Sequence, residues 1–150
     1  MRKYRNMLAI MLLLFAVSVH ADEPKLATAS RFVTCVLVIE TGDKPLAAWQ
    51  VELRYDAATT AIVGLERGGA TGYKTDTAPR YDARGLTAGR IKIADFSLAD
   101  DLPAGSVRVA VLHLELRDGA TTLPTVHTII AATTDGAKFT ATATLKEETR

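Results

Sequence analysis

Eight consecutive residues, 49–56, alternate strictly between apolar and polar side chains. The apolar positions are Trp49, Val51, Leu53 and Tyr55, and the polar positions are Gln50, Glu52, Arg54 and Asp56. A period of two places these sets on opposite faces of a β-strand, whereas a helix would mix them. The segment therefore predicts a strand that buries one face and exposes the other.

The rest of the chain repeats short strand-like segments between turn signals. They are residues 31–40, 61–67, 90–98, 106–117, 123–132 and 138–146. Residues 31–40 are apolar at both parities, which is typical of a central strand covered on most of both sides. Asp118-Gly119 and Asp135-Gly136 are both hairpin signals. No segment keeps apolar residues at helical spacing for more than a turn or two.

This pattern predicts an all-β fold. Seven to nine antiparallel strands separated by turns indicate an immunoglobulin-like or jelly-roll β-sandwich, or a small barrel. A domain of about 130 residues hides roughly two-thirds of its unfolded surface, which is enough for an independent core.

The N-terminus has the three parts of a secretory signal peptide. Arg2, Lys3 and Arg5 are followed by an apolar run over 8–17, and Val19 and Ala21 occupy the small-residue positions before a cleavage site. A permanent membrane anchor would need about 20 apolar residues. We therefore expect a signal helix over residues 1–21, cleavage after Ala21, no stable membrane anchor, and a secreted or periplasmic protein.

The remaining chain has the length of one domain. We expect a short linker over 22–30, the sandwich over 31–146 and a tail over 147–150. Three of the 18 basic residues and none of the 17 acidic ones lie in the leader, so residues 22–150 carry a net charge of −2. Nucleic acid is an unfavourable partner, because phosphate binding needs clustered Lys and Arg.

The order of these segments resembles a cohesin domain. The similarity lies in an apolar first strand, the strand 48–56 ending in Tyr-Asp, the strand 62–66, the strands 89–94 and 105–116, and a closing Asp-Gly turn at 134–139. It extends over most of residues 31–146. The same order of segments also resembles that of the related carbohydrate-binding-module-like sandwiches.

The resemblance implies a nine-stranded jelly roll without catalytic activity or cofactor, whose work is binding. In cellulosomal cohesins one sheet face binds a dockerin module. Here the expected partner is another exported protein. The alternative is a polysaccharide, which a carbohydrate-binding module would bind through loop aromatics.

Residues 68–88 form a long segment with four glycines and few aliphatic residues. A loop of this length is uncommon without a purpose, and we expect at most a short strand near Tyr73. Tyr73 and Tyr81 stand in it without apolar neighbours. Exposed aromatic rings can stack on sugars or anchor a protein partner, which makes both tyrosines candidate binding residues. The alternative is that both rings fold back over a sheet edge.

Catalytic and metal-binding patterns are weak. The serines lack a nucleophile motif, and Asp56 and Asp95 fit strand-ending aspartates that bond turn backbone better than a catalytic pair. If the strands carrying His113 and His127 formed a hairpin near residue 120, the two rings could approach, but zinc would need further ligands. We expect neither a catalytic nor a metal site.

Cys35 is the only cysteine, so no disulfide can form within the chain. Its strand-like apolar surroundings predict a buried, inert thiol. An intermolecular disulfide and a reactive thiol are the alternatives.

Overall fold

The computed structural model describes residues 29–74 and 76–148. Its regular structure is almost entirely β. The elements are β1 (Arg31–Glu40), β2 (Ala48–Arg54), β3 (Thr60–Arg67), β4 (Arg80–Tyr81), a 3-10 helix η1 (Ala83–Leu86), β5 (Arg90–Phe96), β6 (Ser106–Leu116), β7 (Thr125–Ala132), β8 (Lys138–Phe139) and β9 (Thr142–Glu147).

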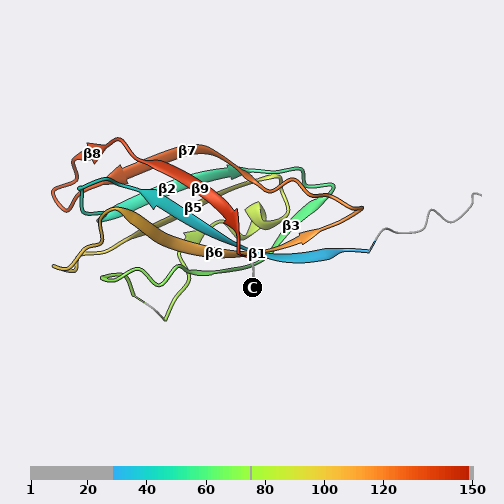
Figure 1. Cartoon of the computed structure of the whole chain (residues 1–150), viewed down its shortest axis with the longest axis horizontal. Coiled ribbons are helices and arrows are strands. Elements are labelled where there is room, and N and C mark those ends of the chain that lie inside the picture. Colours follow the sequence, from blue (N-terminus) through green and yellow to red (C-terminus); the bar gives the residue numbers. More distant parts are fainter. Residues whose placement is uncertain (1–28, 75, 149–150) are drawn as a thin grey trace, which may run out of the picture.

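The strands form two antiparallel sheets that pack as a sandwich (Figure 1). One sheet has the order β3-β6-β1-β9, and the other has the order β4-β5-β2-β7-β8. The connection between β3 and β4, green in Figure 1, projects on the side of the sandwich away from β7 and β8. The predicted all-β sandwich is confirmed.

The two strands with the clearest sequence patterns behave as expected. In β2, Trp49, Val51 and Leu53 are buried between the sheets. Strand β1 is an inner strand of its sheet, between β6 and β9, and Val36 on its outer side is also buried. The core between the sheets is aliphatic because the inward positions of the long strands carry Val, Ile and Leu. Its fully buried side chains include Leu37, Ile39, Val51, Leu53, Ile91, Ile93, Leu112, Leu114 and Leu116.

The last predicted strand is divided between the two sheets. Residues 138–139 pair with β7, whereas residues 142–147 pair with β1. The alternation nevertheless continues through the break, and Phe139, Ala141, Ala143 and Leu145 all pack against the core. A period-two pattern indicates which face of a strand is buried, but it does not indicate which sheet contains the strand's pairing partner.

Two turn predictions have different outcomes. Asp135-Gly136 lies in the loop between the paired strands β7 and β8, so this hairpin is confirmed. The hairpin predicted at Asp118-Gly119 is wrong, although both residues have positive φ angles of 51° and 74°. Strands β6 and β7 belong to different sheets, so this turn leads from one layer to the other.

The strands of the sandwich extend over residues 31–147. Strand β1 begins at Arg31, and β9 ends at Glu147, one residue into the predicted tail. The predicted signal helix and cleavage site, residues 1–21, lie outside the described residues, as does most of the linker. Within the described part of the chain, no helix has the length and apolar character needed to cross a membrane.

Candidate functional site

The outer face of the five-stranded sheet carries an apolar groove. Its walls are the side chains of Phe96 on β5 and Ile130 on β7, which are 50% and 38% exposed. Its floor lies over β2, where the small side chains of Ala48 and of the neighbouring Ala94 on β5 and Ala132 on β7 leave room between the two walls. The groove measures about 300 Å³, and its outward-facing members are Ala48, Gln50, Arg80, Ala94, Phe96, Ile130 and Ala132.

Strand register brings these residues together. Ala48 lies opposite Phe96 on one side and Ala132 on the other. Gln50, two residues along, lies between Ala94 and Ile130. Because paired residues of adjacent strands share a face, three strands that are distant in sequence contribute to one surface.

Arg80 on the edge strand β4 covers one wall of the groove. It lies opposite Ala94, and its guanidinium carbon sits 5.0 Å from the centroid of the Phe96 ring. A cation over an aromatic face is attracted by the ring quadrupole, by about 0.5–1 kcal/mol at exposed sites. This contact holds Phe96 in place while leaving half of the ring accessible.

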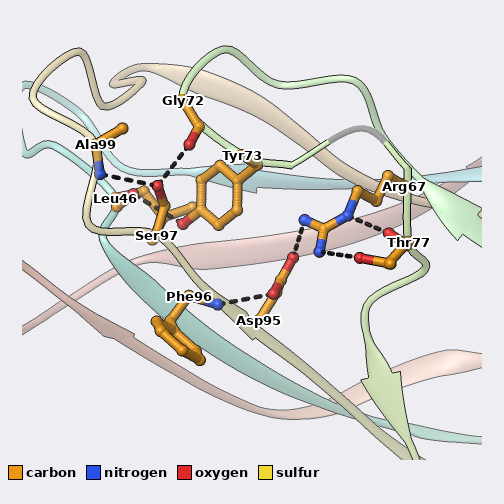
Figure 2. Close-up of polar contacts among 9 residues, drawn as sticks. All are labelled: Leu46, Arg67, Gly72, Tyr73, Thr77, Asp95, Phe96, Ser97 and Ala99. Carbon is orange, nitrogen blue, oxygen red and sulfur yellow. Dashed lines mark hydrogen bonds and ion pairs between the residues drawn. The ribbon is translucent and has the colours of Figure 1, made fainter.

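Asp95, the neighbour of Phe96, points the opposite way, into the space between the sheets (Figure 2). It pairs with Arg67 at the end of β3, and both side chains are largely buried. The other carboxylate oxygen accepts a hydrogen bond from the Phe96 backbone N–H at 2.9 Å. The pair therefore joins the two sheets directly behind the exposed ring.

The loop between β3 and β4 is fastened beside this ion pair. Arg67 donates to the backbone and hydroxyl oxygens of Thr77. The Tyr73 hydroxyl donates to the Leu46 carbonyl at 2.8 Å, and the Ser97 hydroxyl donates to the Gly72 carbonyl at 2.5 Å (Figure 2). The loop and β5 enclose a cavity of about 670 Å³ whose wall includes Arg67, Lys74, Asp95 and Phe96.

The two predicted tyrosine candidates have different surroundings. The Tyr73 ring is partly buried against the core, and this burial raises the pKa of its phenol, with Asp95 adding to the shift. Its hydroxyl donates its hydrogen bond to the Leu46 carbonyl and is therefore not free to donate to a ligand. Tyr81 lies on β4, opposite Ile93, and is 39% exposed. The short strand in this segment, β4, contains Tyr81. The short strand expected near Tyr73 does not form.

The candidate acids do not meet. Asp95 is paired in register with Trp49 near the start of β2, whereas Asp56 follows the end of that strand. Seven residues of chain, roughly 23 Å when extended, separate Trp49 from Asp56. Asp56 bonds the Ala58 backbone N–H at 2.9 Å, as predicted for a turn-forming aspartate.

The two histidines are also apart, because β6 and β7 lie in different sheets. The hairpin that would have brought their rings together is therefore absent. His113 instead contacts Glu66 at 3.1 Å and Thr34 at 3.3 Å on the outer side of the four-stranded sheet. Over residues 29–74 and 76–148, no group of three or more potential metal ligands is found.

Cys35 is fully buried in β1, which confirms the predicted position of the thiol. Burial, reinforced by the negative charge of Glu147, raises the pKa of this thiol to about 11, while Arg31 opposes the shift. The thiolate is the reactive form of cysteine, so the native thiol is poorly suited to nucleophilic chemistry.

Comparisons with known proteins find solved structures with a similar fold. No protein-family model matches the sequence, and no curated protein matches it either. The crystal structure of the CaDoc0917–CaCohA2 complex matches with a TM-score of 0.61 and 19% identity, covering 75% of this chain and 84% of that one. This chain has a cohesin-like fold.

A second solved structure agrees. The cohesin module of the family 33 glycoside hydrolase of Clostridium perfringens matches with a TM-score of 0.57 and 13% identity over 78% of this chain and 84% of that module. The cohesin-like fold was thus correctly expected from the order of strand patterns. At these identities the likeness extends to the fold alone.

The groove of this cohesin-like domain was missed by sequence reasoning. The sequence pattern predicts that Phe96 and Ile130 belong to strands over 90–98 and 123–132, and it assigns neither residue a role in binding. A signal was present at Phe96, because it falls on the opposite parity to Ile91 and Ile93 in the same strand. With Ile91 and Ile93 facing inward, that parity predicts an exposed aromatic ring.

Proposed function

We propose that this protein is a non-catalytic binding domain that recognises another protein through the apolar groove on the outer face of its five-stranded sheet. The observation that carries this proposal is the exposure of Phe96 and Ile130 at opposite walls of one groove. Partly exposed aromatic and aliphatic side chains around a depression are the usual anchors of protein interfaces.

The distribution of exposed apolar groups supports this choice of face. Six large hydrophobic side chains are exposed among the described residues, and two of them, Phe96 and Ile130, lie together on the outer face of the five-stranded sheet. Tyr81 is paired with the inward-facing Ile93, and Leu98 follows the end of β5. The remaining two, Phe32 and Val63, belong to the four-stranded sheet. A protein partner is also supported by the structural neighbour CaCohA2, which was solved in complex with CaDoc0917.

The partner is proposed to be an exported protein. The basic start, short apolar run and small residues before position 22 support export of this chain. The two molecules would then meet in the periplasm or outside the cell.

A protein partner is favoured over a polysaccharide. Sugar-binding sites need an accessible aromatic face for stacking. Tyr73 is partly buried and its hydroxyl is bonded, so of the two loop tyrosines only Tyr81 offers such a face. Enzymatic activity has weaker support still, because Asp56 and Asp95 lie at opposite ends of β2.

The experiment is affinity capture with the purified protein from the exported proteins of its source cells, followed by quantitative mass spectrometry. The bait is compared with Ile130→Asp and Phe96→Ser variants, and with Phe32→Ser as the matched control. We expect a discrete protein that binds the parent and the control equally, and binds both groove variants at least about tenfold less, as loss of an interface anchor predicts.

The proposal fails if no protein is captured, or if the captured protein binds the groove variants as well as the parent. A glycan array run with the same four proteins and with a Tyr81→Ala variant tests the alternative. Glycan binding that is lost in Tyr81→Ala and kept in Ile130→Asp would replace the protein-binding proposal. Circular dichroism must show that every variant remains folded.

A further inference from the structure

The face that carries the groove is also strongly basic. Within the strands of this sheet, five outward-facing cationic side chains share the face with one carboxylate, Glu52, which gives these strands a net charge of +4, although residues 22–150 carry −2 overall. The cations are Arg54, Arg80, Arg90, Lys92 and Lys138, and all five are exposed. Strand register sets their common side, because each is paired with, or alternates in phase with, an outward-facing residue.

These cations are poorly neutralised within the domain. Glu52 is buried beneath them and forms ion pairs with two of them, with Arg54 at 3.2 Å and with Lys92 at 3.9 Å. Arg90 lies directly opposite Arg54 across the β2–β5 pair. Like charges at opposed positions of a sheet repel each other. Among the residues described, neither Arg90 nor Arg80 nor Lys138 has an ion-pair partner.

Nearby acidic residues offset little of this charge at the face. Asp56, just past the end of β2 and in phase with Arg54, lowers the net charge by one and accepts a hydrogen bond from the Ala58 backbone N–H. Asp95 points inward to Arg67. Asp82, which follows β4, pairs with Arg84 at 3.1 Å and so contributes no net charge. The surface therefore presents an apolar centre within a positive field.

We propose that the partner binds this face with an acidic surface that surrounds one apolar anchor. This inference rests on the proposed protein-binding function and adds the chemistry of the partner. The anchor enters between Phe96 and Ile130, flanked by Arg80 and Lys138. A carboxylate further along reaches the opposed guanidinium groups of Arg54 and Arg90, where it relieves their repulsion.

The strand geometry gives the spacing of these two features. Four residues of β2 separate Gln50, at the floor of the groove, from Arg54. At about 3.3 Å per residue this separation is roughly 13 Å. On a helix of the partner, with a rise of about 1.5 Å per residue, an anchor and a carboxylate would lie about nine residues apart.

A protein is favoured over the other anionic macromolecules. Nucleic acid and anionic membranes are bound mainly through phosphate contacts and need little more than clustered cations. Here the centre of the positive field is an apolar groove with room for a side chain. That combination matches the apolar core and polar rim of a protein interface.

The test is to pan the purified protein against a random 16-residue peptide display library, so that the chemistry of the face is measured without a known partner. Peptides that bind the parent but not Ile130→Asp define the groove-directed set. Their affinities are then measured for Arg54→Glu/Arg90→Glu and for Lys146→Glu, the matched charge reversal on the exposed side of β9. Each measurement is repeated at low and high salt.

We expect groove-directed peptides to be enriched in Asp and Glu around an aromatic or aliphatic residue. Their affinity should fall at least tenfold in the double charge reversal and less than threefold in Lys146→Glu. High salt should also weaken them, because exposed charges are screened within a Debye length of about 10 Å at 0.1 M.

Other results separate the two proposals. Groove-directed peptides that are neutral or basic overturn the acidic partner and leave the protein-binding function standing. Peptides that all bind Ile130→Asp normally, or no bound peptides at all, contradict both. Binding to phosphatidylglycerol vesicles that requires Arg54 and Arg90, without any groove-directed peptide, would make the face a membrane surface and overturn the inference.

Discussion

Arg67 at the end of β3 and Asp95 at the end of β5 form a buried ion pair that links the two sheets. The same arginine holds Thr77 of the long loop, and the same aspartate bonds the backbone of Phe96. One pair thus connects the sandwich, the loop and the exposed ring of the groove (Figure 2).

Removing one member of this pair should destabilise the fold. Arg67→Met leaves the Asp95 carboxylate buried without its cation, which costs about 3–5 kcal/mol of unfolding free energy in comparable pairs. Urea denaturation measures the loss. The exposed pair between Arg31 and Glu147 is the control, and Arg31→Met should cost no more than about 1 kcal/mol. Equal losses in the two variants would show that the Arg67–Asp95 pair is not structural.

The two loop tyrosines should differ in their effect on stability. Tyr73→Phe keeps the packed ring but removes the hydrogen bond to the Leu46 carbonyl, a loss of about 1 kcal/mol. Tyr81→Phe changes an exposed side chain for which no hydrogen bond is found among the described residues, and should alter stability by less than about 0.5 kcal/mol. Thermal unfolding compares the two, and a larger loss in the Tyr81 variant would contradict the placement of Tyr73.

Gly68 is required by a close backbone contact. A Cβ atom there would lie 2.0 Å from the Arg108 carbonyl oxygen, so Gly68→Ala must displace β3 from β6. Gly69 has φ +81°, and a Cβ atom added to it would meet nothing within 4 Å. Gly69→Ala therefore carries only the cost of a left-handed residue, about 1 kcal/mol. Denaturation of both variants should show the larger loss at Gly68, and the reverse order would rule out the close contact.

The Cys35 thiol should be unreactive in the native protein. Its pKa of about 11, against an ordinary value of 9.0, means that the native thiol stays protonated at pH 8 and is also inaccessible. A chromogenic disulfide reagent at pH 8 should label it only after denaturation. Rapid labelling of the native protein would contradict the buried position.

The same thiol makes stability depend on alkaline pH. The neutral form is favoured in the folded state, so this contribution is fully present below pH 9. It is lost as pH rises through the interval from about 9 to about 11, because only the unfolded thiol ionises there. Cys35→Ser removes the titrating thiol. The unfolding free energy of this variant should therefore lack the part of the decrease between pH 9 and pH 11 that the thiol causes.

The leader should be removed during export. Intact-mass analysis of protein from the periplasm or culture fluid is expected to show a chain that begins at Asp22. The Ala21→Arg variant should be processed poorly, because the peptidase site requires a small residue at this position. Recovery of the parent protein with residues 1–21 still attached would refute the signal-peptide assignment.

The class of the fold follows from local sequence patterns alone. Strict alternation in β2 identified its buried face, and apolar residues at both parities marked β1 as an inner strand. These inferences hold because side-chain direction in a strand is a local property of the backbone. The cohesin-like arrangement is also predictable from the sequence, because the resemblance depends on the order of the strand patterns along the chain.

Which strands are neighbours, and therefore where the groove forms, depends on long-range packing. A local sequence pattern does not indicate which strands pair with each other. The pattern therefore predicts one strand where the fold has β8 and β9, and a hairpin between β6 and β7. In the fold, the members of each of these pairs belong to different sheets. The groove depends on register between β5, β2 and β7, which brings Phe96 and Ile130 to the same face. The inward turn of Tyr73 likewise depends on Leu46, 27 residues earlier. Such contacts join distant parts of the chain, and their energies arise only once the sheets have packed.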